Sequence, residues 1–140
     1  MRTAGVLSIR RLKPWLMSRS LRMRRTICGV YMVLIAVLSL VPSWLFPPSL
    51  ANVPGMDKWV HVAMYGVLGM LLRWTVGTRS GLARWWLPAA GAGYGLLMEF
   101  LQLWLCAGTR SFSWEDALAN LAGVTVAWLW MDNILAKSGI

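Results

Sequence analysis

Ionisable and amide side chains recur at helical spacing inside otherwise apolar stretches of the chain. Asp57, His61 and Tyr65 follow one another at intervals of four residues, so a helix would place all three on one face. Glu99 and Gln102, in the next apolar stretch, are three residues apart and share a face in the same way. Because such groups are costly in lipid, their presence inside membrane-length helices predicts a functional site.

A third polar stripe opens the last apolar stretch. Asp116, Asn120 and Gly123 are spaced by four and three residues, and a helix again aligns them. Asp116 is the expected N-cap of this helix, with Ser113 as the alternative. Small residues recur on the third and fourth apolar stretches and would let these helices approach closely. They are Gly91, Gly95, Ala119, Gly123 and Ala127.

The residue types suit recognition of a polar or anionic group together with proton transfer. Lys58 and Arg110 would hold an anion such as a phosphate or a carboxylate. Glu99, His61 and Asp116 would set its protonation and orientation, and they are the candidate acid/base groups. The other expected binding residues are Asp57, Tyr65, Gln102 and Asn120.

Plainer interpretations of the same residues stay open. Asp57 and Lys58 can simply begin a helix, with Asp57 as N-cap. His61 is the only histidine, and a lone histidine more often completes a hydrogen-bond network than binds a metal. Glu99 can be a structural ion-paired group, with Lys58, His61 or Arg110 as its partner. Because the sequence contains no glycine-rich phosphate loop, paired-histidine site or serine nucleophile elbow, no metal and no cofactor are expected.

The composition is that of a small integral membrane protein. Of the 140 residues, 58% are hydrophobic and 14% are charged, and the mean hydropathy is +0.57. Soluble domains carry about a quarter charged residues. Ten tryptophans point the same way, because tryptophan favours membrane–water interfaces. The length allows one domain.

Four apolar stretches are long enough to span a bilayer and predict an all-α bundle of four transmembrane helices. This transmembrane domain, 26–137, follows a basic segment, 1–25, which holds eight arginine and lysine residues and no acidic residue. The expected helices are about 26–46, 57–76, 85–106 and 114–135.

The distribution of lysine and arginine predicts the orientation. The segment 1–25 and the connection at 77–84 are basic, whereas the loop after residue 46 has no basic residue before Lys58. By the positive-inside rule both termini are cytoplasmic and the three stripes lie near the outer face. We expect a multi-pass protein of the inner membrane whose segment 1–25 contacts anionic lipid and not nucleic acid. The alternative start residues are Met1, Met17 and Met23.

The polar residues also form an ordered pattern. It reads Asp57-Lys58-x-x-His61-x-x-x-Tyr65, then Glu99-x-x-Gln102, then Arg110-Ser-Phe-Ser-x-x-Asp116-x-x-x-Asn120-x-x-Gly123. The pattern resembles the VanZ-like family over 57–123, and the preceding apolar helix fits that family's layout, with 1–25 outside the shared part. The resemblance implies a small bacterial multi-pass membrane protein. The family is named for a member linked to low-level teicoplanin resistance. It implies no particular reaction, and it does not by itself make this chain a resistance protein.

The expected function is recognition of a lipid headgroup or a peptidoglycan-related precursor in an outward-facing polar pocket, with an effect on glycopeptide susceptibility as one consequence. One alternative is an enzyme that acts on a lipid-linked substrate, with Glu99 or His61 as acid/base. Another is a purely structural network that holds the helices together. Ion or proton transfer is disfavoured, because the inner halves of the helices hold almost no polar groups.

Overall fold

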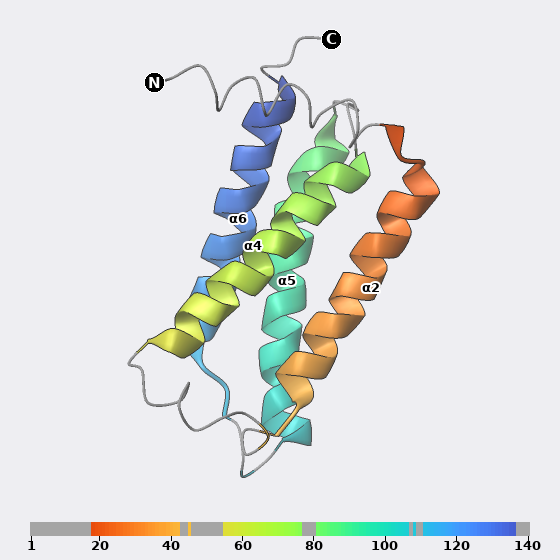
Figure 1. The fold of residues 1–140 in the computed structure, drawn as a ribbon. Coiled ribbons are helices and arrows are strands. Elements are labelled where there is room, and N and C mark those ends of the chain that lie inside the picture. The colour runs from red at the N-terminus through yellow and green to blue at the C-terminus, as the bar shows by residue number, and fades with distance from the viewer. Residues whose placement is uncertain are drawn as a thin grey trace, which may run out of the picture.

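Four long helices make up most of what the computed structural model describes, which is residues 18–42, 45, 55–76, 81–106, 108 and 111–136. The helices are α2 (Leu21–Leu40), α4 (Met56–Val76), α5 (Leu82–Leu105) and α6 (Trp114–Ala136), and these described residues contain no strand. Figure 1 shows that the helices lie side by side and alternate in direction. The predicted all-α class is therefore confirmed.

The first helix begins and ends earlier than the predicted 26–46. It begins at Leu21 because the Ser20 hydroxyl accepts a hydrogen bond, at 3.2 Å, from the backbone N–H of Met23. It ends at Leu40 because the next residue precedes Pro42 and takes the extended conformation that proline favours in its neighbour. The last residues of the expected basic segment thus belong to α2, while residues 1–17 lie outside the described part.

The other three helices begin at Met56, Leu82 and Trp114, close to the predicted 57, 85 and 114. Because direction alternates, the end of α2, the start of α4, the end of α5 and the start of α6 share one end of the bundle (Figure 1). We call this the polar end, since it carries the three predicted stripes.

Helices α4 and α6 make the most extensive contact in the bundle, and glycine makes it possible. A Cβ atom on Gly69 would overlap the backbone of Val124. A Cβ atom on Gly123 would lie 2.5 Å from the carbonyl oxygen of Val62. The two backbones therefore touch over about two turns, as small residues allow in membrane helix pairs.

A buried ion pair joins α4 to α6 at the end of the bundle opposite the polar end. The Arg73 Nε donates to the Asp132 Oδ1 at 2.7 Å, and both side chains are largely buried. Arg24 of α2 lies nearby, donates to the carbonyl oxygen of Trp74 at 3.4 Å and stacks over its ring. Polar groups thus occur at both ends of the bundle, which the sequence pattern did not predict.

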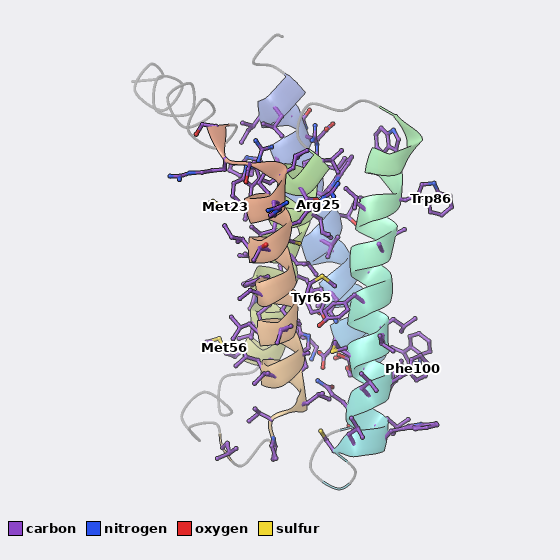
Figure 2. The ribbon with its side chains drawn as sticks, turned by 90° about the vertical axis from the view of Figure 1, so that its right-hand side faces the viewer. Met23, Arg25, Met56, Tyr65, Trp86 and Phe100 are labelled. Carbon is purple, nitrogen blue, oxygen red and sulfur yellow. The ribbon has the colours of Figure 1, made fainter. Side chains whose placement is uncertain are left out.

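The outer surface of the bundle is apolar over most of its length. Tyr65 lies inside the bundle, whereas Trp86 and Phe100 point away from α5 (Figure 2). Trp104 is 82% exposed. By length and composition two of the described helices can cross a membrane, over Leu21–Leu40 and Trp114–Leu135. An apolar surface of this extent suits contact with lipid.

The close α4–α6 contact leads to a prediction about two glycine substitutions. Gly69→Ala should lower the free energy of unfolding by about 1–3 kcal/mol, because the added methyl group has no space between the backbones. Gly93→Ala is the matched control: nothing lies within 4 Å of the Cβ it would add on α5, and alanine should raise helix stability by about 0.5–1 kcal/mol. Thermal unfolding of the purified variants in detergent measures both, and equal midpoints would contradict the packing described here.

Candidate functional site

Three of the predicted polar side chains meet at the polar end of the bundle. His61 of α4, Glu99 of α5 and Asp116 of α6 each offer one nitrogen or oxygen atom, and these atoms all lie within 4.8 Å of one another. The alternating direction of the helices brings them to one level, although Glu99 stands near the end of its helix and the others near the start. We call these three residues the polar centre.

His61 is held by the side chain of Asn120, which is 1% exposed. The Nδ1 atom of His61 lies 2.9 Å from the Asn120 Oδ1. Because a carbonyl oxygen can only accept, Nδ1 carries the proton in this arrangement. The Nε2 atom faces the Asp116 Oδ2, 4.0 Å away. The Tyr65 ring, one turn along α4, lies parallel to the imidazole.

Glu99 is fully buried and is tied to the start of α6. Its Oε2 accepts a hydrogen bond from the backbone N–H of Ser113 at 3.3 Å. The Ser113 hydroxyl in turn accepts from the backbone N–H of Asp116 at 3.2 Å. Ser113, the alternative in the sequence prediction, is therefore the N-cap of α6, and this leaves the Asp116 carboxylate turned toward the polar centre.

Two buried polar atoms in and beside the polar centre keep unused hydrogen-bonding capacity. The Asp116 Oδ1 and the Asn120 Nδ2 have no hydrogen-bond partner among the residues that the structure describes. One is an acceptor and the other a donor. Leaving such an atom unsatisfied costs about 1–3 kcal/mol, so a ligand that fills both positions would gain that much in return.

Lys58 lies at the rim of the polar end and does not contact Glu99. Its Nζ is 2.8 Å from the Glu115 Oε2 and 3.4 Å from the Asp57 Oδ2, and all three side chains are largely exposed. Asp57 lies in the first turn of α4 and is not its N-cap. The sequence pattern did not predict Glu115 as the partner of Lys58. The position of Glu115 next to Asp116, in the first turn of α6, could have indicated that it lies at the same end of the bundle. Exposed pairs of this kind contribute little stability.

Gln102 does not join the polar centre. Its Nε2 donates to the carbonyl oxygen of Ser39 at 3.0 Å, so it links α5 to α2. Arg110, the expected anion-binding residue of the outer loop, lies outside the described residues.

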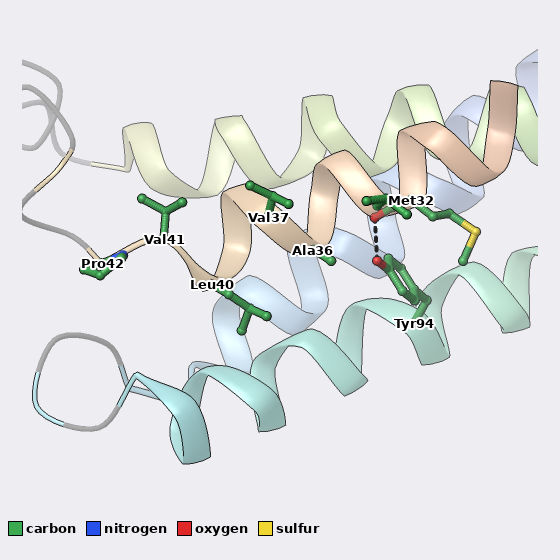
Figure 3. A pocket seen from close by; sticks show the side chains of 8 residues that line it. Met32, Ala36, Val37, Leu40, Val41, Pro42 and Tyr94 are labelled. Atoms are coloured by element: carbon green, nitrogen blue, oxygen red, sulfur yellow. Dashed lines mark hydrogen bonds between the residues drawn. The ribbon is translucent and has the colours of Figure 1, made fainter.

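An apolar groove runs between α2 and α5, and no residue of the polar centre lines it. Figure 3 shows side chains that line it, among them Ala36, Val37 and Leu40 from α2. The Tyr94 hydroxyl at its edge donates to the carbonyl oxygen of Met32 at 2.6 Å. That hydroxyl is thus engaged within the bundle, and the groove offers a ligand mainly apolar contact.

Comparison with known protein families adds to this geometry. A family model described as VanZ/LLP1 matches residues 14–135. The chain belongs to the VanZ/LLP1 family. The predicted resemblance is confirmed, and the VanZ/LLP1 match extends it to α2 and to part of the basic segment that had been placed outside the shared region. No curated protein and no solved structure matches the chain.

VanZ/LLP1 membership and the apolar helices together identify the chain as a membrane protein. Seven of the nine predicted site residues lie in the polar centre, beside it or at the rim, while Gln102 bonds to Ser39 and Arg110 lies outside the described residues. His61, Glu99 and Asp116 form the centre, Asn120 and Tyr65 adjoin His61, and the Asp57–Lys58 pair lies at the rim. A sequence pattern alone cannot separate these groups, because helical spacing does not show which side chains meet between helices.

A neutral substitution should cost much less at the polar centre than at the Arg73–Asp132 pair. Glu99→Gln keeps the size of the side chain and an oxygen that can accept from Ser113, so the unfolding midpoint should change little. Asp132→Asn, the control, leaves Arg73 buried without its ion partner and should cost about 3–5 kcal/mol. Thermal unfolding in detergent with a chelator present compares them. A fall for Glu99→Gln as large as that for Asp132→Asn would make the polar centre a structural network.

Proposed function

We propose that this VanZ/LLP1 protein binds the polar headgroup of a membrane lipid, or of a lipid-linked cell-wall precursor, at the polar end of its bundle. The observation that carries the proposal is the meeting of His61, Glu99 and Asp116 from three helices, with a buried atom on each of Asp116 and Asn120 that has no hydrogen-bond partner among the described residues. A network built only to join helices would satisfy its own members.

The chemistry of the open atoms suggests the kind of headgroup. A carboxylate oxygen accepts from a hydroxyl, and an amide N–H donates to one. A glycerol or sugar hydroxyl group fits both. Lys58 at the rim, and Arg110 in the loop before α6, would hold an attached phosphate. The polar centre would thus bind the hydroxyl groups, and the basic side chains would bind the anion.

We further propose that all four helices span the inner membrane with both termini in the cytoplasm. The basic residues of 1–25 and 77–84 favour the cytoplasmic side for the end opposite the polar centre. Arg24 and Arg73 lie at that same end of the bundle. The polar centre then faces the outer leaflet, where envelope lipids and wall precursors are exposed.

An enzymatic role is a second candidate, and it has an observation in its favour. The Nε2 of His61 lies beside Asp116 and Glu99, and in the neutral imidazole this atom has a lone pair. An imidazole placed in this way can act as a general base toward a bound hydroxyl group. Such an enzyme would bind the headgroup as proposed above and would then turn over the lipid-linked substrate. His61→Gln would abolish the turnover.

Lipid retention tests the proposed binding. The purified full chain in detergent is incubated with phosphatidylglycerol, phosphatidylethanolamine and undecaprenyl phosphate, and co-purifying lipid is quantified by mass spectrometry. We expect one of these lipids to be retained at about one per chain, and to be lost in Asp116→Asn, which removes an open acceptor and a charge from the polar centre.

Glu115→Gln is the matched control, because it changes the neighbouring carboxylate of the same helix turn outside the polar centre. This variant should keep the lipid. Failure of the wild-type chain to retain any of the three lipids, or equal retention by Asp116→Asn, would contradict the proposal.

A further inference from the structure

The three side chains of the polar centre have the composition of a metal-ligand set. One imidazole and two carboxylates come from three different helices, and their nearest nitrogen and oxygen atoms lie within 4.8 Å of one another. Mixed imidazole and carboxylate ligands suit first-row divalent ions such as Zn²⁺. Sequence spacing did not predict such a site, because its members are 38 and 17 residues apart and no two share a helix.

His61 is already oriented as metal-binding histidines are. Such residues usually donate their other ring N–H to an oxygen that fixes the tautomer. Here Nδ1 meets the Asn120 Oδ1 at 2.9 Å, and Nε2 is left to face the Asp116 Oδ2 at 4.0 Å. Asn120 is 1% exposed, so the surrounding side chains leave its amide little room to turn, and this keeps the imidazole in its orientation.

Two carboxylates lie close together in the polar centre. Glu99 is 0% exposed, and Asp116 offers an oxygen within 4.8 Å of it. Lys58 lies outside this cluster and pairs with Glu115 and Asp57 at the rim. The buried Asp116 Oδ1, which has no hydrogen-bond partner among the described residues, is a second oxygen available to an ion.

We propose that His61, Glu99 and Asp116 bind one divalent metal ion of the Zn²⁺ class, with Asn120 as the positioning residue for His61. Ligand atoms around tetrahedral zinc lie about 3.4 Å apart, so atoms now as much as 4.8 Å apart need to close by up to about 1.4 Å. Three protein ligands leave a fourth position open for water or for a phosphate oxygen. The site goes beyond the proposed headgroup binding, and the ion would bind whether or not a lipid is present.

Direct metal measurement tests this site. The full chain, purified in detergent without a polyhistidine tag, is stripped with a chelator, exchanged into metal-free buffer and titrated with ZnCl₂ by calorimetry. We expect one Zn²⁺ per chain, and visible absorption bands when CoCl₂ replaces zinc. His61→Gln and Asp116→Asn should abolish stoichiometric binding, and Asn120→Ala should weaken it by about 10–100-fold.

Glu115→Gln should bind zinc as the wild-type chain does, and thermal unfolding without metal verifies that each variant is folded. Absence of stoichiometric zinc in the wild-type chain, or unchanged binding by folded Asp116→Asn, would overturn the metal site. Lipid retention measured in chelator separates the two proposals: retention without zinc leaves headgroup binding intact while the metal site fails.

Discussion

The backbone contact between α4 and α6 is the constraint on which the polar end depends. Because Gly69 and Gly123 have no side chains, the two helices approach until a Cβ at either position would meet backbone atoms. At that separation the imidazole of His61 reaches the amide of Asn120 across the interface. A wider spacing would separate the pair and leave two buried polar groups without each other.

The two ends of the bundle use polar groups in different ways. At one end Arg73 and Asp132 form a short, buried ion pair, and Arg24 donates to a backbone carbonyl beside it. At the other end the polar centre brings Glu99 and Asp116 together beside His61, whose Nε2 lies 4.0 Å from the Asp116 Oδ2. The first arrangement joins one acidic and one basic group at short distance, and the second brings two acidic groups to one histidine, which is the arrangement on which the proposed binding depends.

The all-helical class could be predicted from the length of the apolar stretches and the helical spacing of the polar residues. The convergence of the three stripes at one end could be predicted because the charges of the loops indicate that successive helices alternate in direction. His61 and Tyr65 share a face at four-residue spacing, and Asp116 and Asn120 do the same, in both the prediction and the structure. The family resemblance could also be predicted. The bounds of α2 could not, because they depend on the Ser20 cap and on how far the helix continues before Pro42.

Partner choice within the site could not be read from spacing either. Gln102 shares a face with Glu99, yet it bonds to Ser39 because α2 packs against that side of α5. Lys58 pairs with Glu115 because the first turns of α4 and α6 meet at the rim. Such choices depend on the rotation of each helix about its axis, which only the packed bundle determines.

In the proposed orientation the polar end of this bundle lies on the outer side of the membrane. Reporter fusions determine the side, with a phosphatase that is active only outside the cytoplasm placed after Thr109 in one fusion and after Ser80 in another. We expect activity from the Thr109 fusion and none from the Ser80 fusion, at equal protein levels. The reverse pattern would place the polar centre on the cytoplasmic side and contradict recognition of an outer-leaflet headgroup.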